Sequence, residues 1–144
     1  MCRLAIAGVG GFEVDDRELS RDGPSYTIDT VRQLLGKGWP QVTWLIGADQ
    51  LNILPKWHEA NKLVKLARLL VVARPGWTLD WNALSPEFRS LAASVIPGPA
   101  MDISSTDIRR RVGKGLSIDF LTPPAVCRYI EEHGLYRGSQ TLNP

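Results

Sequence analysis

A run of hydroxyl side chains followed by an arginine is the segment of this sequence best suited to chemistry. Ser104, Ser105 and Thr106 stand together, and Arg109 lies about one helical turn further on. At the start of a helix the first backbone N–H groups have no intrahelical acceptor, and the helix dipole adds positive potential. Such a terminus binds phosphate, and a nearby guanidinium can hold a phosphate through two hydrogen bonds. The competing interpretation is an ordinary helix cap with solvated arginines, because Ser and Thr are common caps.

Asp49 and Trp57 are two further candidates for contact with a ligand. Asp49 follows a glycine just after an apolar segment, so it could accept hydrogen bonds from a ribose or help to hold a metal. An Asp in this context equally often bridges a turn. Trp57 follows Pro55-Lys56, and an indole in a loop either stacks on a flat ring or packs into the core.

Several other catalytic patterns are missing from the sequence. A GxGxxG dinucleotide motif that begins at Gly8 would need a glycine where Glu13 stands. His58 and His133 are isolated, and no Ser-centred GxSxG elbow occurs. The sequence therefore predicts no metal site built from protein ligands and no catalytic triad.

The elements that must position these residues alternate between strands and helices, which predicts βαβ units and a parallel sheet. Strands are expected at 12–14, 42–46, 68–73 and 94–96; helices are expected at 2–8, 27–35 (capped by Ser25), 59–66, 106–112 and 124–133. The strands at 42–46 and 68–73 are nearly continuous apolar runs, as in sheets buried on both faces. Ligands of such sheets bind beyond the carboxyl ends of the strands. Asp49, Arg74 and the segment 102–109 are therefore expected to lie along one edge.

Length and composition set the remaining bounds. A chain of 144 residues, 44% hydrophobic and 22% charged, is expected to form one globular domain spanning 1–144. The net charge of +2, from 17 basic and 15 acidic side chains, does not favour a nucleic-acid partner. No apolar stretch is long enough to cross a membrane. Cys2 and Cys127 are predicted to be buried free thiols, which favours a cytoplasmic protein.

In these segments the sequence resembles bacterial nicotinate-mononucleotide adenylyltransferases. The matching stretches, in chain order, are GPSYTIDT at 23–30, LIGADQL at 45–51 with Trp57 downstream, RPG at 74–76, ISST at 103–106 with Ile108 and Arg109, and two C-terminal stretches at 126–130 and 134–136. The resemblance covers nearly the whole chain. ISSTxIR is typical of the superfamily, and SYTIDT with GADQL is typical of this branch. The resemblance implies a Rossmann-like nucleotidyltransferase fold with a parallel sheet.

The resemblance also implies a reaction and a set of site residues. AMP would pass from ATP to nicotinate mononucleotide (NaMN), giving nicotinate adenine dinucleotide (NaAD) and pyrophosphate, with Mg²⁺ accompanying the ATP. Phosphate and adenosine binding would fall to Ser104, Ser105, Thr106 and Arg109, with Arg109 also catalytic through charge neutralisation. Contacts to the nucleotide and nicotinate would come from Thr27, Asp49, Trp57 and Arg74, the nicotinate ring stacking on Trp57. His58 stands where some relatives carry Tyr.

The sequence departs from the family pattern at its front. The 144 residues contain no GxFxPxHxGH segment, whose two histidines hold the ATP phosphates in the family. The expectation is a domain that lacks its opening strands, with exposed apolar faces that leave oligomerisation open and with weak or absent activity. The alternatives are a non-catalytic nucleotide-binding module or a fragment of the enzyme. A sister enzyme acting on phosphopantetheine is disfavoured by SYTIDT and Trp57.

Overall fold

The structure is a computed structural model, and it describes residues 1–73, 78, 80–99 and 101–137. The chain divides into two compact units. Unit 1 consists of Met1–Asp16 together with Met101–Pro144, and unit 2 is Arg17–Ala100. The single domain expected over 1–144 stays a prediction.

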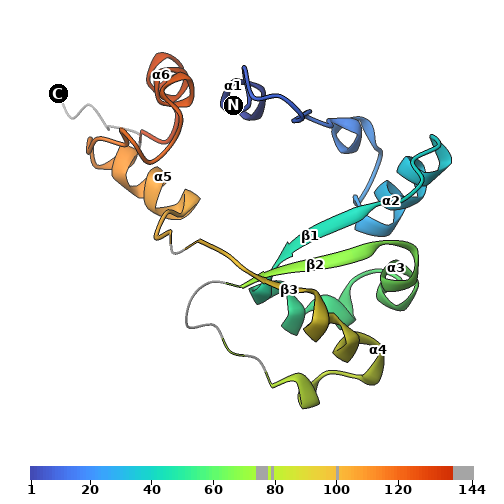
Figure 1. The fold of residues 1–144 in the computed structure, drawn as a ribbon. Coiled ribbons are helices and arrows are strands. Elements are labelled where there is room, and N and C mark those ends of the chain that lie inside the picture. Colours follow the sequence, from blue (N-terminus) through green and yellow to red (C-terminus); the bar gives the residue numbers. More distant parts are fainter. Residues whose placement is uncertain (74–77, 79, 100, 138–144) are drawn as a thin grey trace. The chain divides into compact units, whose positions relative to one another are not determined.

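A three-stranded parallel sheet forms the centre of unit 2. Its strands are β1 (Thr43–Gly47), β2 (Arg68–Ala73) and β3 (Val95–Pro97), paired in that order. Parallel neighbours require a crossover connection. The helix α3 (Ala60–Leu66) supplies the first crossover and α4 (Pro86–Arg89) the second, on the same side of the sheet (Figure 1). The predicted α/β fold with a parallel sheet is confirmed.

Among the described residues of unit 2, the remaining elements are one longer helix and five short 3₁₀ turns. They are α2 (Thr27–Gly36), η1 (Arg17–Ser20), η2 (Ala48–Asn52), η3 (Leu54–Lys56), η4 (Trp81–Ala83) and η5 (Ser90–Ser94). The helix predicted at 27–35 is confirmed to within one residue, as are the strands predicted at 42–46 and 94–96. The periodic apolar positions of 27–35 favour a helix, and the short, largely apolar runs at 42–46 and 94–96 favour strands.

Two apolar clusters hold unit 2 together. The first lies under the sheet and joins Ile46, Leu69 and Val71 to Phe88 of α4. The second joins α2 to α3, and consists of Ile28, Val31, Val42, Leu63 and Ala67. Ile28, Val31 and Leu63 are fully buried, and burial of each such side chain stabilises the fold by roughly 1.5–3 kcal/mol.

The opposite face of the sheet is more open than the sequence predicts. Leu45 is 61% exposed and Ile96 is 40% exposed. Successive side chains of a strand point to opposite faces, and α3 and α4 lie on one of these faces. The prediction that β1 is buried on both faces is therefore wrong at Leu45, although Ile46 is buried.

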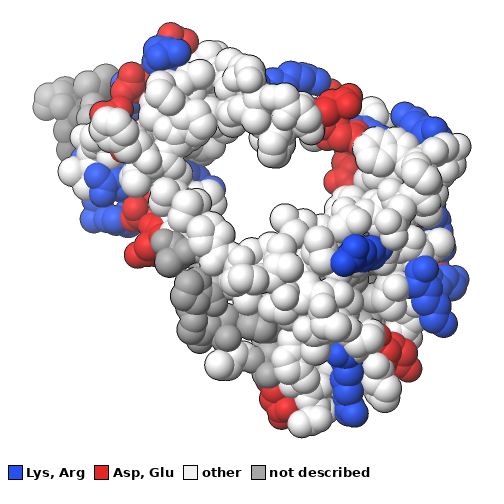
Figure 2. Space-filling view, viewed as in Figure 1, with Lys and Arg blue, Asp and Glu red and all other residues white. Residues whose placement is uncertain are grey.

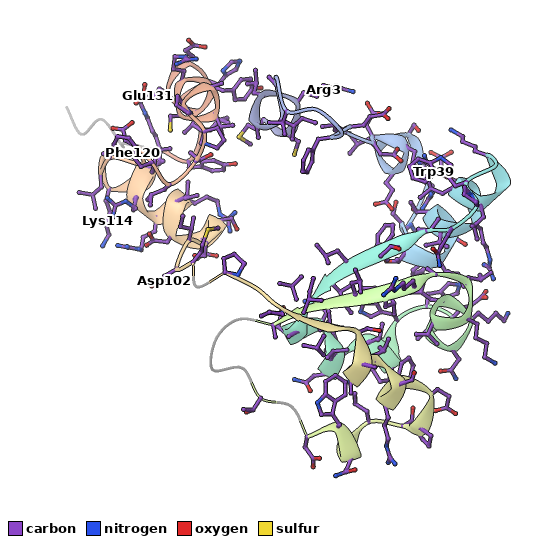
Figure 3. The ribbon with its side chains drawn as sticks, in the orientation of Figure 1. Arg3, Trp39, Asp102, Lys114, Phe120 and Glu131 are labelled. Carbon is purple, nitrogen blue, oxygen red and sulfur yellow. The ribbon has the colours of Figure 1, made fainter. Side chains whose placement is uncertain are left out.

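Unit 1 is helical over its described residues. It contains α1 (Cys2–Ala5), α5 (Ser105–Gly113) and α6 (Pro124–Glu132), and its core consists of Ile118, Val126, Cys127 and Ile130. Asp102 lies just before α5 and Lys114 at its far end, with Phe120 in the segment that leads to α6 (Figure 3). Burial raises the pKa of the Cys127 thiol, as expected for a buried free cysteine.

Four local predictions are wrong. The helix predicted at 2–8 covers only Cys2–Ala5, and residues 6–8 form a turn. Residues 12–14 form no strand, and Phe12 is 67% exposed, so a short β-like run without a neighbouring strand did not become one. Ser25 does not cap α2, because Tyr26 is the N-cap and makes no side-chain cap bond. Cys2 is exposed, because the four-residue α1 has no buried residues.

The distribution of surface charge and the length of the helices both bear on the expectations from composition. On the face drawn in Figure 2, basic and acidic side chains are interspersed. Within the part of the chain that the structure describes, no helix is long and apolar enough to span a membrane.

Candidate functional site

The start of α5 carries the predicted cluster of hydroxyl groups. Ser104 is the N-cap in extended conformation, and its Oγ accepts a hydrogen bond from the Asp107 N–H at 3.1 Å. Ser105 and Thr106 form the first turn and are exposed. The cap thus uses the Asp107 N–H, while the N–H groups of Ser105 and Thr106 have no acceptor within the helix. The capping interpretation of Ser104 is confirmed, and phosphate binding stays a prediction.

Three consecutive arginines on α5 have different partners. Arg109 donates to Thr106 Oγ1 at 3.4 Å, which keeps its guanidinium beside the hydroxyl cluster. Arg110 pairs with Asp107, and Arg111 donates through Nε to the Ser117 carbonyl at 2.8 Å. Arg109 is therefore the arginine placed to meet an anion at this helix terminus.

Asp49 lies in η2, directly beyond the carboxyl end of β1, where the parallel-sheet rule places ligands. Its side chain is exposed, and Gln50 Nε2 donates to its Oδ2 at 2.8 Å. The other oxygen, Oδ1, folds back toward Gly47. Arg74, predicted to lie along the same edge, is outside the described residues.

Thr27 and Trp57, both in unit 2, flank a contact between two rings. Thr27 is the first residue of α2, and Trp57 ends η3 just before α3. Their neighbours Tyr26 and His58 stack with ring centroids 4.2 Å apart and an interplanar angle of 25°. The structure thus brings the two predicted acceptor-pocket segments, 26–27 and 57–58, against each other.

Trp57 itself is half-buried and packs against both apolar clusters of unit 2. The core-packing interpretation is therefore correct for part of the indole. The remaining part borders a shallow hollow lined by Pro55, Trp57, Glu59, Ala60, Asn61 and Lys62. An indole held in this way is a rigid surface on which a flat ring can stack.

Sequence reasoning missed an ion-pair network beside these residues. Glu59 Oε2 lies 2.6 Å from Arg32 Nη2 and 3.0 Å from Lys62 Nζ. The hydrogen bond from Arg32, followed by that from Lys62, lowers the pKa of Glu59 from 4.5 to about 2. Charge spacing along a helix could have indicated the Glu59–Lys62 pair, which is i,i+3. The Arg32–Glu59 pair joins residues 27 positions apart and depends on how α2 and α3 pack.

The predicted site residues are divided between the two units. Thr27, Asp49 and Trp57 belong to unit 2, and the segment 104–109 belongs to unit 1. Their predicted convergence on one edge of the sheet stays a prediction. Among the described residues, no group of three or more His, Cys, Asp or Glu side chains is arranged to hold a metal ion.

Comparison with known proteins places the chain in a family. Residues 1–111 match the model of the cytidylyltransferase-like family. Over 139 residues the chain is 47% identical to the probable nicotinate-nucleotide adenylyltransferase of Roseiflexus sp. (strain RS-1), covering 95% of this chain and 70% of that protein. It is 45% identical to the corresponding protein of Herpetosiphon aurantiacus, covering 94% of this chain and 70% of that protein. The chain therefore belongs to the cytidylyltransferase-like family and, within it, to the nicotinate-nucleotide adenylyltransferases.

Solved structures agree with this fold. The nicotinic acid mononucleotide adenylyltransferase of Plasmodium falciparum, complexed with NaAD, superposes with a TM-score of 0.60 at 21% identity. The same enzyme complexed with APC gives a TM-score of 0.55 at 21% identity. In both comparisons 81% of this chain is covered, and the chain spans 60% of the length of the solved chain. The resemblance and the Rossmann-like fold expected from the sequence are confirmed.

Proposed function

We propose that this chain takes part in the transfer of AMP from ATP to nicotinate mononucleotide, which gives NaAD and pyrophosphate. The observation that carries the proposal is the contact between segments 26–27 and 57–58, made by the Tyr26–His58 ring stack. It brings a helix terminus and an indole surface together in a chain 43–47% identical to nicotinate-nucleotide adenylyltransferases.

The start of α2 suits an aromatic acid. Thr27 is the first residue of this ten-residue helix, and no side chain caps the terminus. The N–H groups of the first turn and the helix dipole favour an anion there. A nicotinate ring stacked on Trp57 would place its carboxylate near this terminus, whereas a nicotinamide has no charge to be stabilised. Preference for the acid over the amide follows from this arrangement.

The donor side of the reaction requires phosphate binding and charge neutralisation. The phosphate oxygen of NaMN forms a bond to the α-phosphorus of ATP while the bond to the β-phosphate oxygen breaks, and pyrophosphate leaves. Such a transfer needs positioning and electrostatic stabilisation rather than a covalent enzyme group. In the proposal Ser104, Ser105 and Thr106 bind phosphate, Arg109 neutralises charge, and Asp49 contacts the nucleotide.

Magnesium enters the proposal with ATP. Mg²⁺ prefers oxygen ligands and is commonly held by substrate phosphates with only one or two carboxylates from the protein. The exposed carboxylate of Asp49 fits that limited role.

A cytoplasmic location accords with ATP as the donor and with two free cysteines.

Isothermal titration of the purified chain tests the proposal. We expect NaMN to bind, nicotinamide mononucleotide to bind at least about tenfold more weakly, and Trp57→Leu to lose NaMN affinity while keeping ATP affinity. Equal binding of the acid and the amide, or no binding of NaMN, would contradict the proposal.

Formation of NaAD should be measured on the same preparation. The 144 residues contain two histidines, at positions 58 and 133, and no HxGH pair. We therefore expect the 144-residue polypeptide by itself to bind both substrates and to turn over far below ordinary enzyme rates. ATP binding without NaMN binding would instead favour a nucleotide-binding module.

A further inference from the structure

Two bridges join α2 to the segment before α3, one at the start of the helix and one further along it. The first is the Tyr26–His58 ring stack, with centroids 4.2 Å apart. The second is the ion pair between Arg32 Nη2 and Glu59 Oε2 at 2.6 Å. The first bridge lies directly beside Thr27 and Trp57, the residues that the proposed function assigns to the acceptor. Glu59 of the second bridge follows soon after Trp57 in the chain.

Glu59 has an uncommon backbone conformation. Its φ of 50° and ψ of 38° lie in the left-handed region, which costs free energy for a residue with a side chain. This conformation lets the chain leave Trp57 and enter α3 at once: the Glu59 carbonyl accepts from the N–H of Lys62 and Leu63 at 2.8 and 3.0 Å. Glycine would adopt this left-handed conformation more easily. The presence of glutamate instead therefore suggests that its side chain has a function.

The Arg32–Glu59 ion pair acts on a segment that the apolar core holds only weakly. Buried Ile28 and Val31 anchor α2, and buried Ala60 and Leu63 anchor α3. His58 is a partly exposed side chain on the segment between them. An ion pair as exposed as Arg32–Glu59 adds little to global stability, so its main effect falls on the local position of this segment.

We propose that Glu59 is a positioning residue for the acceptor: through Arg32 it fixes the Trp57–His58 segment against the start of α2. The distance between the indole surface and Thr27 then stays constant when NaMN binds. The inference rests on the proposed function, because it concerns the same acceptor site. Pre-organisation of this kind improves affinity by reducing the ordering required on binding.

Neutral variants with a matched control test the proposal. Arg32→Gln and Glu59→Gln each remove the bridge between α2 and the segment before α3. Lys65→Gln is the control, because it removes an exposed positive charge of α3 that lies outside the hollow beside Trp57 and outside the ion pairs of Glu59. We expect Arg32→Gln and Glu59→Gln to weaken NaMN binding about two- to fivefold, with ATP affinity and Tm nearly unchanged. Lys65→Gln should bind NaMN like the wild type, and the double variant Arg32→Gln/Glu59→Gln should bind NaMN no more weakly than Glu59→Gln alone.

A second variant separates the charge from the backbone. Glu59→Gly relieves the left-handed conformation while it removes the ion pair, so it should keep or raise Tm and still weaken NaMN binding. Wild-type affinity for NaMN in both Glu59→Gly and Arg32→Gln would overturn the inference, as would a parallel loss of ATP affinity. If the wild-type chain itself fails to bind NaMN, the proposed function fails and the inference fails with it. If the wild type binds and the variants match it, the inference fails alone.

Discussion

The Asp49 carboxylate folds back over the α-carbon of Gly47, so that a Cβ at position 47 would lie 2.5 Å from Asp49 Oδ1. The backbone of Gly47, with φ of −71° and ψ of 148°, is accessible to any residue. Space rather than backbone conformation therefore favours glycine here, because a larger residue would displace the Asp49 carboxylate. Gly47 permits the carboxylate to take this position at the carboxyl end of β1.

Gly47→Ala should displace the Asp49 carboxylate without unfolding the chain. The added methyl group meets the end of a flexible side chain, so the carboxylate can swing away at little cost to stability. We expect nucleotide affinity to fall about tenfold, because a hydrogen bond to a charged group is lost. Titration with ATP measures this. Gly36→Ala, where nothing lies within 4 Å of the added Cβ, is the control and should leave ATP affinity intact.

Ser104 allows capping to be separated from phosphate binding. Ser104→Ala removes the hydrogen bond to the Asp107 N–H and should destabilise the chain by about 1 kcal/mol. Ser104→Asp keeps a good cap but adds a negative charge beside the proposed phosphates. It should retain stability and lose ATP affinity, as followed by thermal unfolding and titration. Unchanged ATP affinity in Ser104→Asp would leave Ser104 with the cap alone.

Arg109 and Arg110 form a matched pair on α5. Arg109 lies beside Thr106, whereas Arg110 is engaged with Asp107. Arg109→Gln should weaken ATP binding about tenfold and make it less sensitive to salt, since a charged contact to phosphate disappears. Arg110→Gln should change ATP affinity little. Equal losses in both variants, measured over a range of ionic strength, would argue for a diffuse basic surface rather than a specific contact.

The depressed pKa of Glu59 predicts an acid-dependent part of stability. Because the pKa falls from 4.5 to about 2 in the folded chain, the ionised carboxylate stabilises the fold above pH 4.5. That contribution is lost as the pH falls from 4.5 toward 2. Urea unfolding at several pH values should show Glu59→Gln with a slightly flatter profile than the wild type over this interval, a small difference because the ion pair is exposed to solvent. Parallel profiles would contradict the assignment of the pKa shift to the contacts of Glu59.

The parts of the fold that were predictable have strong local signals. The apolar period of 28–35 predicts α2, the run at 68–73 predicts β2, and the hydroxyl groups at 104–106 predict the start of α5. The failures depend on tertiary neighbours. Phe12–Val14 resembles a strand but pairs with no strand in the part of the chain that the structure describes, and Leu45 is apolar although it is largely exposed. Local sequence cannot supply either fact.

The same division holds for the candidate site. Ser104, Asp49 and Trp57 could be selected because each follows a recognisable element and has suitable chemistry. The Tyr26–His58 stack and the Arg32–Glu59 pair could not, because both join residues about 30 positions apart through the packing of α2 on α3. The left-handed backbone of Glu59 is equally invisible in the sequence, since a glycine would have been the expected signal.

The two cysteines of unit 1 give the chain a practical property. Cys2 is exposed on α1, whereas Cys127 is buried and its thiol pKa is raised, so it forms little of the nucleophilic thiolate. A maleimide dye should therefore couple at Cys2 before it reaches Cys127, without any cysteine being added or removed. The native chain thus offers one addressable attachment point on unit 1. Energy transfer between a dye on Cys2 and a fluorescent nucleotide would then report binding of that nucleotide.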